Sequence, residues 1–362
     1  MGAVVNRETP LAELVGGVAM PTAHFYIRNH FPTPARDPAR WRLRVGGLVR
    51  RQLSLTLQEL LRMPSEVRAV TLECAGNGRA LMQPRVGGEQ WGLGAVSTAE
   101  WAGVPLLAVL HRAGLDSAAQ AMIFKGADGF ERGLTLAEAR ESEALVVYAM
   151  NGELLPRQHG RPLRLIVGGW YAVASVKWLT EIEVTDRPFS GHFQTEKYVY
   201  QWERKGGLVS EPVRYQRVRA LISEPAPDAL VAPGEVPLRG YAWSGEALIK
   251  RVEVSVDSGC WQPARLLGAP DRYRWRRWEL IARLGPSRRV RVRARAIDEA
   301  GNTQRDQVEW NRLGYGNNAI QEVAFRITPS VPMHTGHSRP PALPALGARL
   351  WEGSPSDTPA SL

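Results

Sequence analysis

The hydrophobic pattern of the first half of the chain alternates between short apolar runs and clusters of turn residues. Apolar runs of this length, bounded by Gly, Asn, Asp or Pro, predict β-strands. The predicted strands are Trp41–Val49 (a strand pair), Val70–Leu72, Ile123–Gly126, Ala144–Met150, Leu163–Val167 and Val176–Val184. The predicted short helices are Thr56–Arg62, Pro105–Ala113 and Leu136–Arg140. This mixture of elements predicts a domain of the α+β class.

From about Arg219 onward the pattern predicts strands alone. These strands are Val236–Ala242, Ile249–Asp257, Trp275–Ala282 and Val290–Asp298. Short strands at this spacing are typical of an immunoglobulin-like sandwich. In the last strand, small or apolar residues alternate with Arg291, Arg293 and Arg295, so a row of charges is expected to face solvent.

A chain of 362 residues is too long for one ordinary core, so two domains are expected. We expect an N-terminal segment over 1–20, a first domain over 21–212 and a second domain over 213–330. Residues 331–362 are rich in Pro, Gly, Ser and Ala. We expect this tail to be largely disordered or to wrap a neighbour.

The charge is biased toward cations. The chain has 46 Lys and Arg against 36 Asp and Glu, a net charge of +10, and only 5 of the basic residues are Lys. Three interpretations stay open: a general preference for Arg, anion binding at a site, and an acidic redox partner. The basic stretch Arg272–Trp278, RYRWRRW, comes without a recognised nucleic-acid module, so nucleic acid is not an expected partner.

Targeting signals and cysteines add little. No apolar run is long enough for a membrane span, and the first twenty residues lack a secretory pattern. The chain as given is therefore expected to be cytoplasmic, or periplasmic if a leader is missing. Its two cysteines, Cys74 and Cys260, lie in different predicted domains, so no disulfide is expected.

The most distinctive stretch is Val70–Gly94, which reads VTLECAGNGRALMQPRVGGEQWGLG. Its strand delivers Cys74 into a turn whose glycines let a ligand approach the main chain. Arg79 follows, and a nearby cation lowers the pKa of a cysteine and favours the thiolate that binds metal. Trp91 is expected to wall the same pocket. From these residues alone, a buried structural cysteine is an equal alternative.

The motif CAGNGR, followed by QWGLGAVSTAEWAGVPL, resembles the molybdenum-binding segment of the sulfite oxidase family. Further motifs in family order extend the resemblance over about Phe25–Ile320. It implies a molybdopterin-binding domain followed by a β-sandwich dimerisation domain, and hence a homodimer. It also implies that Cys74 is the only protein ligand of molybdenum, with a molybdopterin dithiolene and oxo groups completing the coordination.

Thr22–Pro34, TAHFYIRNHFPTP, is predicted to be extended because of its prolines and aromatic residues. Taken alone, it fits a solvated loop. However, FYIRNHFPTP resembles the family segment that lines the pterin cofactor and whose arginine also reaches the anionic substrate. The resemblance assigns these residues to the cofactor: Tyr26, Ile27, Arg28, Asn29 and His30.

A second cationic set lies in Pro156–Thr185, where His159, Arg164 and Lys177 surround a predicted turn. Such a set suits a terminal phosphate, although surface charges on a hairpin would look the same. The segment resembles the family pattern HGxPxRxxxPG…G…SVKWL, which implies contacts to the pterin phosphate. The resemblance adds Ser175 and Val176 to the cofactor contacts. Two positions depart from the pattern, namely Gly168 for Pro and Ala172 for Gly.

The segment HFQTEKY resembles the family motif HWQxxDY and implies that Tyr198 lies beside the molybdenum oxo group. Phe193 for Trp and Lys197 for Asp are departures, and Tyr200 is a competitor for the role. Asp128 stands where the family has a cofactor-contacting aspartate, although Asp-Gly is also a common turn signal.

The segment WNRLGYGNNAI resembles the closing family motif WNxxGxxxN, in which animal members place an arginine that enters the substrate pocket. Arg312 is offset from that arginine by one position. The resemblance implies oxidation of sulfite and water to sulfate with release of two electrons. In that reaction Arg28 and Arg79, with Arg312, would hold the dianion, and Tyr198 would bond to the oxo group or product.

The chain has no CxxCH haem-attachment motif and no room for a haem domain, so a separate acceptor such as a cytochrome is expected. A reductase of nitrate or a sulfoxide on the same scaffold is the alternative, and the arginines suit nitrate better than a neutral sulfoxide. A non-catalytic basic binding protein is the alternative from another class. It leaves Cys74, Arg28 and the His159–Lys177 set without explanation.

Overall fold

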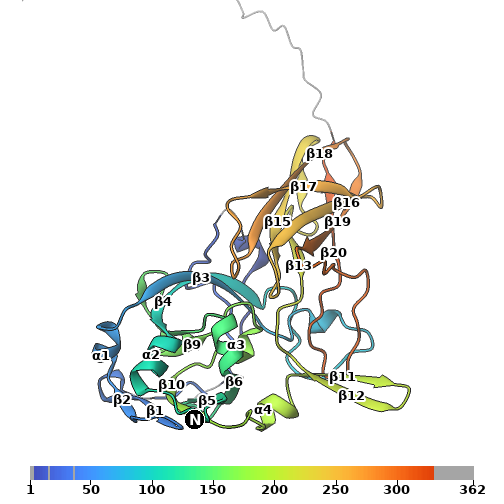
Figure 1. Cartoon of the computed structure of the whole chain (residues 1–362). Coiled ribbons are helices and arrows are strands. Elements are labelled where there is room, and N and C mark those ends of the chain that lie inside the picture. Colours follow the sequence, from blue (N-terminus) through green and yellow to red (C-terminus); the bar gives the residue numbers. More distant parts are fainter. Residues whose placement is uncertain (1–3, 15–16, 36, 330–362) are drawn as a thin grey trace, which may run out of the picture. The chain divides into compact units, whose positions relative to one another are not determined.

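The computed structural model describes residues 4–14, 17–35 and 37–329, and Figure 1 shows their arrangement. Contacts join the chain as far as Pro329 into one compact unit. Within it we call residues 21–212 the first domain and residues 213–329 the second domain. The expectation for 331–362 concerns residues outside the described ranges.

The first domain contains a five-stranded sheet in the order β2-β1-β10-β5-β6. β1 and β10 run parallel and the other neighbours run antiparallel. The strands are β1 Leu43–Gly47, β2 Leu53–Leu55, β5 Ala121–Gly126, β6 Glu131–Thr135 and β10 Leu179–Thr185.

An antiparallel sheet, β3-β4-β7-β8, with β9 paired to β7, completes this domain. Its strands are β3 Glu66–Glu73, β4 Val96–Pro105, β7 Leu145–Met150, β8 Glu153–Leu154 and β9 Arg164–Ile166. β3 ends one residue before Cys74, and β9 begins at Arg164. Two strands of this sheet, separated by β4 and β7, therefore carry expected site residues at or next to their ends.

Helices are few and short, which confirms the α+β class. The α-helices are α1 Leu57–Leu61, α2 Leu106–Ala113, α3 Leu136–Glu141 and α4 His192–Thr195. Single 3₁₀ turns occur at η1 Leu11–Glu13, η2 Pro38–Arg40, η3 Arg79–Leu81, η4 Arg157–His159 and η5 Ala172–Ala174. Thr56 and Thr135 begin α1 and α3 with complete capping boxes, which satisfy backbone N–H groups that a helix start leaves free.

The structure differs from the predicted elements in several places. The segment 41–49, expected to be a strand pair, contributes a single strand, β1, which pairs with β2. The strand expected over 176–184 begins only at Leu179, because Trp178 has a left-handed backbone (φ 50°) that a strand cannot contain. β4 was not predicted, although it is ten residues long. The hairpin of β11 Val199–Arg204 and β12 Gly207–Pro212 was not predicted either, and it extends away from the sheets (Figure 1).

The second domain is the expected β-sandwich. Its strands follow one hydrogen-bonded path, β13-β15-β18-β17-β16-β19-β20-β14. They are β13 Arg219–Glu224, β14 Leu230–Val231, β15 Gly234–Trp243, β16 Ile249–Val256, β17 Gln262–Leu267, β18 Arg276–Leu284, β19 Arg289–Asp298 and β20 Gln321–Ile327. Along β19 the apolar positions are buried, and Arg291, Arg293 and Arg295 are exposed or half-buried, as the alternating pattern predicted. Arg295 in addition pairs with Glu253 at 2.7 Å.

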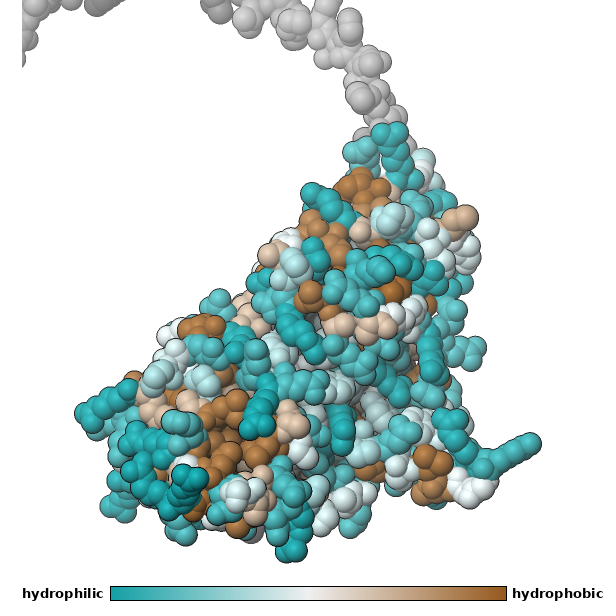
Figure 2. Space-filling model, in the orientation of Figure 1, coloured by the Kyte–Doolittle hydropathy of each residue, from teal (hydrophilic) through white to brown (hydrophobic). Residues whose placement is uncertain are grey.

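Three apolar clusters fill the interior. One packs around the β2-β1-β10-β5-β6 sheet, one fills the sandwich, and one joins the β3-β4-β7 sheet to the second domain. The joining cluster contains Leu72 and Cys74 together with Tyr241, Trp243 and Trp275. The face of the molecule shown in Figure 2 is mostly hydrophilic with scattered apolar patches. No helix among the described residues is long and apolar enough to span a membrane.

Candidate functional site

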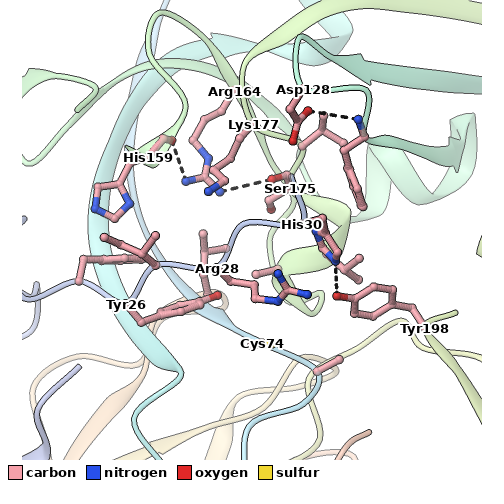
Figure 3. Close-up of a pocket in the computed structure, with 18 residues that line it drawn as sticks. Tyr26, Arg28, His30, Cys74, Asp128, His159, Arg164, Ser175, Lys177 and Tyr198 are labelled. Atoms are coloured by element: carbon pink, nitrogen blue, oxygen red, sulfur yellow. Dashed lines mark hydrogen bonds between the residues drawn. The ribbon is translucent and has the colours of Figure 1, made fainter. Parts of the chain in front are cut away.

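A cavity in the first domain gathers most of the polar residues that the sequence singled out (Figure 3). They arrive from five separate segments: the extended stretch before residue 31, the end of β3, the β5–β6 turn, the 157–178 region and the residue before β11. Its polar lining consists of Tyr26, Arg28, His30, Cys74, Asp128, His159, Arg164, Ser175, Lys177 and Tyr198. Ile27 and Val176 also line it.

Cys74 lies at one end of this cavity. Its amide donates to the carbonyl of Ala95 (2.9 Å), and its own carbonyl accepts from the amide of Asn77 (2.9 Å), which closes the turn. Gly78 completes the turn with a left-handed backbone (φ 79°) that favours glycine. Only 6 % of the Cys74 surface is exposed, so the thiol faces the cavity and not bulk solvent.

The neighbouring cation had led us to predict a lowered pKa for Cys74, but the pKa of this thiol is raised. Burial raises the pKa of the thiol, and the opposing effects of the Gly76 amide, Arg28 and Arg79 do not offset it. The prediction was therefore wrong for the protein alone. A coordinated metal ion supplies the positive charge that deprotonates a thiol.

The other end of the cavity is cationic. Arg164 donates to the carbonyls of His159 (3.0 Å) and Ser175 (3.3 Å), and its Nε has no hydrogen-bond partner. Lys177 donates to the side chain of Asn29 and to the carbonyl of Gln158. Burial, followed by the charge of Arg164, holds the pKa of Lys177 well below its usual value.

Arg28 lies between these two ends, with Cys74 on one side and Lys177 on the other (Figure 3). Its guanidinium donates to the carbonyl of Asn29 and, at 3.5 Å, to the side chain of Asn6. Among the described residues, neither Arg28 nor Arg164 nor Lys177 has a carboxylate within ion-pair distance. Buried cations without counter-charge are costly, so this arrangement favours a bound anion.

Two histidines in the cavity are neutral. Burial, helped by Arg28 and Lys177, lowers the pKa of His30 to about 2. Burial, helped by Arg164 and Lys177, lowers the pKa of His159 to about 3. His30 stacks on Phe130, with ring centroids 4.6 Å apart.

Tyr198 reaches the cavity and its competitor Tyr200 does not. The Tyr198 hydroxyl lies 2.5 Å from Nε2 of His30, and its ring stacks on Tyr315 at 4.9 Å. Its backbone is left-handed (φ 53°), directly before β11 begins at Val199. Tyr200 instead packs under the guanidinium of Arg217, 4.5 Å from its ring centre.

Four predicted site residues do not line the cavity. Arg79 donates to the carbonyls of Gly314 (3.2 Å), Glu89 (3.0 Å) and Leu313 (3.3 Å), and it covers the ring of Tyr315. Trp91 is buried in the cluster that joins the domains, Arg312 is exposed, and Asn29 is buried behind Lys177.

Sequence reasoning missed Phe130 and Tyr315, the rings that support His30 and Tyr198. Phe130 directly follows the Asp128-Gly129 turn, and Tyr315 lies within the motif WNRLGYGNNAI, so each was next to a recognised signal. Nothing in the local pattern says that either ring backs the cavity.

The donor set can hold a metal only together with a cofactor. No group of three or more His, Cys, Asp or Glu side chains in the described part of the chain is arranged to bind an ion. One thiol at one end and unpaired cations at the other fit a group that brings its own metal ligands and carries an anionic tail. Molybdenum–molybdopterin has both properties.

Two family models match the chain. The model described as oxidoreductase molybdopterin binding domain matches residues 30–193, and the Mo-co oxidoreductase dimerisation domain matches residues 212–328. Both matches agree with the order of the two domains.

Curated proteins and solved structures are similar over most of the chain. Mitochondrial sulfite oxidase of Mus musculus is 36 % identical over 90 % of this chain, which spans 64 % of that protein's length. Sulfite oxidase of Arabidopsis thaliana is 31 % identical over 89 % of this chain and 92 % of its own length. The sulfane dehydrogenase SoxCD of Paracoccus pantotrophus superposes with a TM-score of 0.79 at 27 % identity, covering 87 % of this chain and 83 % of that one.

Proposed function

Because this chain belongs to the sulfite oxidase family of molybdopterin-dependent oxidoreductases, we propose that it oxidises sulfite to sulfate and passes two electrons to a separate acceptor. The observation that carries the proposal is the cavity itself, in which a buried thiol faces three cations without carboxylate partners. The relatives of Mus musculus and Arabidopsis thaliana are both named sulfite oxidase, which favours sulfite among anionic substrates.

We assign the cofactor's contacts as follows. The Cys74 thiolate binds the metal, and Arg164, Lys177 and His159 hold the phosphate end. Tyr26, Ile27, Asp128, Ser175 and Val176 line the cavity and would contact the pterin. Asn29 would act through Lys177, from which its side chain accepts a hydrogen bond. When bound, the cofactor supplies the oxygen transfer and takes up the two electrons.

The protein's own contribution is charge and position. Arg28 is the cation between the thiol and the phosphate-binding end, so we assign it to the sulfite dianion. Burial raises the pKa of Tyr198, so its hydroxyl stays protonated and donates a hydrogen bond to a substrate or product oxygen. The Nε2 of His30, a ring kept neutral by burial, lies 2.5 Å from that hydroxyl. With its proton on Nε2, His30 donates to the hydroxyl oxygen and leaves the hydroxyl proton free for the substrate. Arg79 acts indirectly, because it supports Tyr315, which supports Tyr198.

The test is an assay of purified protein whose molybdenum and pterin contents have been measured. We expect about one molybdenum per chain and sulfite-dependent reduction of ferricyanide. Parallel assays with nitrate and with a sulfoxide, using a reduced dye as electron donor, test the reductase alternative. Turnover of either compound faster than sulfite, or protein without molybdenum after expression in a cofactor-producing host, would contradict the assignment.

The proposal extends to partners. The match to a dimerisation domain supports a homodimer formed through the second domain, residues 213–330. We also propose that the electrons pass to a separate cytochrome. A c-type cytochrome added to the sulfite assay in place of ferricyanide tests that step directly.

A further inference from the structure

The turn that carries Cys74 is attached to the second domain through a buried carboxylate. Glu73 is the last residue of β3 and is 2 % exposed. One carboxylate oxygen accepts from Asn77 (2.9 Å) and from Arg219 (3.4 Å), and the other accepts from the indole of Trp243 (2.9 Å). Two of these three donors therefore come from the sandwich, and the third comes from the turn itself.

The same turn is held a second time by residues 313–317. The amide of Gly316 donates to the carbonyl of Ala75 (2.8 Å), and the side chain of Asn317 donates to the carbonyl of Gly78 (2.7 Å). Arg219 donates to the carbonyl of Asn317 (2.7 Å), so it links both attachments. The carbonyls of Ala75 and Gly78 in this turn therefore both accept hydrogen bonds from the second domain.

A buried ion pair such as Glu73–Arg219 is not the most stabilising contact that could join two domains. A buried ion pair commonly stabilises a fold no better than apolar residues of similar volume would. Directional hydrogen bonds instead fix the relative position of the groups that they join. The apolar cluster around Trp243 and Trp275 already supplies cohesion between the domains, so stability alone does not require the Glu73–Arg219 pair.

We propose that the second domain is part of the metal site, and that Glu73 and Arg219 are positioning residues which hold the Cys74 sulfur at the cavity wall. The proposal rests on the proposed function only for the identity of Cys74 as metal ligand. It assigns to the sandwich a role in addition to dimerisation. If the second domain did not hold the turn, the cavity would remain, but the position of the Cys74 sulfur in its wall would no longer be fixed.

The experiment uses the reactivity of Cys74 in the cofactor-free full chain. Cys260 is exposed, and the change Cys260→Ser leaves Cys74 as the only thiol. The rate of its modification by the disulfide reagent DTNB under native conditions then reports how firmly the turn is held. In this background we expect Glu73→Gln to raise the rate at least tenfold, and Asn317→Ala to raise it by a smaller factor.

A second measurement separates positioning from stability. Glu73→Gln leaves the Arg219 charge buried and unpaired, so that variant should also unfold at a lower temperature. The double change Glu73→Gln with Arg219→Gln removes both charges and should recover much of the thermal stability. If the two residues position the turn, Cys74 stays reactive in the double variant, whereas a purely structural role would return its rate to that of the parent.

The control is Glu253→Gln, which breaks the Arg295 ion pair within the same sandwich (2.7 Å) and far along the chain from the turn. It should leave the thiol rate unchanged. A wild-type rate in both Glu73→Gln and Asn317→Ala would overturn the proposal, and Asn317→Ala keeps it testable if the charge variant does not fold. Because this measurement needs no molybdenum and no sulfite, its result stands apart from that of the proposed function.

Discussion

Single side chains decide what the cavity can hold. Arg28, Arg164 and Lys177 face it as basic side chains, and burial keeps His30 and His159 neutral beside them. A protein without ligand gains nothing from such an arrangement, because burying an unpaired charge costs free energy. An anionic cofactor tail and a dianionic substrate would supply the missing charge. The chemistry of these side chains therefore favours the loaded protein.

His30 and His159 are expected to lower the folding stability of the cofactor-free protein in acid. The pKa values of His30 and His159 in the folded state, about 2 and about 3, lie below the 6.5 of an ordinary histidine. The unfolded chain therefore binds more protons between these values, and folding stability falls as the pH drops below about 6.5. Each histidine contributes roughly 1.4 kcal/mol per pH unit, so both together cost about 5 kcal/mol at pH 4.5.

Urea unfolding midpoints measured from pH 7 to pH 4 test this expectation. Replacing both residues, His30→Gln with His159→Gln, should flatten the dependence of the free energy of unfolding on pH. The exposed His111→Gln is the control and should leave the slope unaltered. If the free energy of unfolding falls as steeply with pH in the double variant, other groups cause the loss of stability in acid.

Cys74→Ser tests the metal ligand. Serine is a harder donor than thiolate and suits a different set of metals. We expect the variant to fold with a near-native unfolding temperature, because the change is small. Its sulfite:ferricyanide activity should drop by more than about 100-fold, since even changes outside the ligand set cost 10–100-fold. Full turnover by Cys74→Ser would disprove the ligand assignment.

The motifs predicted most of the side chains that line the cavity, but not which of the predicted side chains point elsewhere. Arg79 follows the cysteine turn, and we expected it beside the thiol and the substrate. Its guanidinium instead binds carbonyls at Leu313 and Gly314, which lie 234 and 235 positions away in the sequence. No local pattern records where those carbonyls lie. The sequence likewise does not reveal that Tyr198, and not Tyr200, lines the cavity. The two tyrosines differ in their distant partners, which are His30 and Tyr315 for Tyr198 and Arg217 for Tyr200.

Loops at the ends of strands hold the site residues in place. The β5–β6 turn is an example, because it is closely packed and hydrogen-bonded to a neighbouring loop. The amide of Gly126 donates to Phe130 (2.8 Å), and the amide of Ala127 donates to Trp178 (2.8 Å), so this turn is bonded to the Lys177 loop. A Cβ on Gly126 would lie 2.7 Å from the carbonyl oxygen of Lys177 and 2.5 Å from the Asp128 carboxylate.

Gly126→Ala should therefore move the Asp128 turn away from Lys177. We expect a loss of about 1–3 kcal/mol in the free energy of unfolding, as for other overpacked positions, together with lower cofactor content. Gly46→Ala is the matched control, because a Cβ there would meet nothing within 4 Å. Equal stability and equal pterin content in the two variants would show that the turn tolerates displacement.

Elements with strong local signals were predicted well, and those that depend on distant partners were not. Helix α2 lies where Pro105 and Gly114 bounded it in the sequence, and α1 begins at the capping Thr56. β4 was not predicted, and it is held in the sheet by pairing with β3 and β7. Pairing across long separations is not recorded in a single segment's pattern.

Taken as a whole, the molecule joins a cofactor-binding domain to a sandwich that matches a dimerisation model. We expect the protein to sediment as a dimer at micromolar concentration. Ile281 on β18 is 48 % exposed, and a charge there, Ile281→Lys, tests whether this face of the sandwich contributes. Leu154→Lys, on the first domain and 53 % exposed, is the control. A monomer at full cofactor content would count against dimerisation through residues 213–330.

The contact between the two domains resembles the interior of one domain. Trp275 of the second domain donates its amide to the Thr71 hydroxyl of β3 (2.7 Å), and the Thr71 amide donates to the Tyr273 carbonyl (2.8 Å). Tyr241 and Trp275 pack at 4.5 Å within the same cluster as Cys74. Contacts between domains are usually more polar than this, and they leave the domains free to move.

We therefore expect residues 4–329 to unfold in one cooperative step. Calorimetric and van't Hoff enthalpies of the cofactor-free protein should agree within error. A more demanding test places a cavity in the second domain and follows the first. Leu284→Ala, in the sandwich core, should cost roughly 2–5 kcal/mol. In the Cys260→Ser background, exposure of the Cys74 thiol on heating should shift to lower temperature by the same amount as the loss of sandwich structure. If the thiol is exposed at its original temperature while the sandwich melts earlier, the domains unfold separately, and the buried contacts at Thr71 do not couple them.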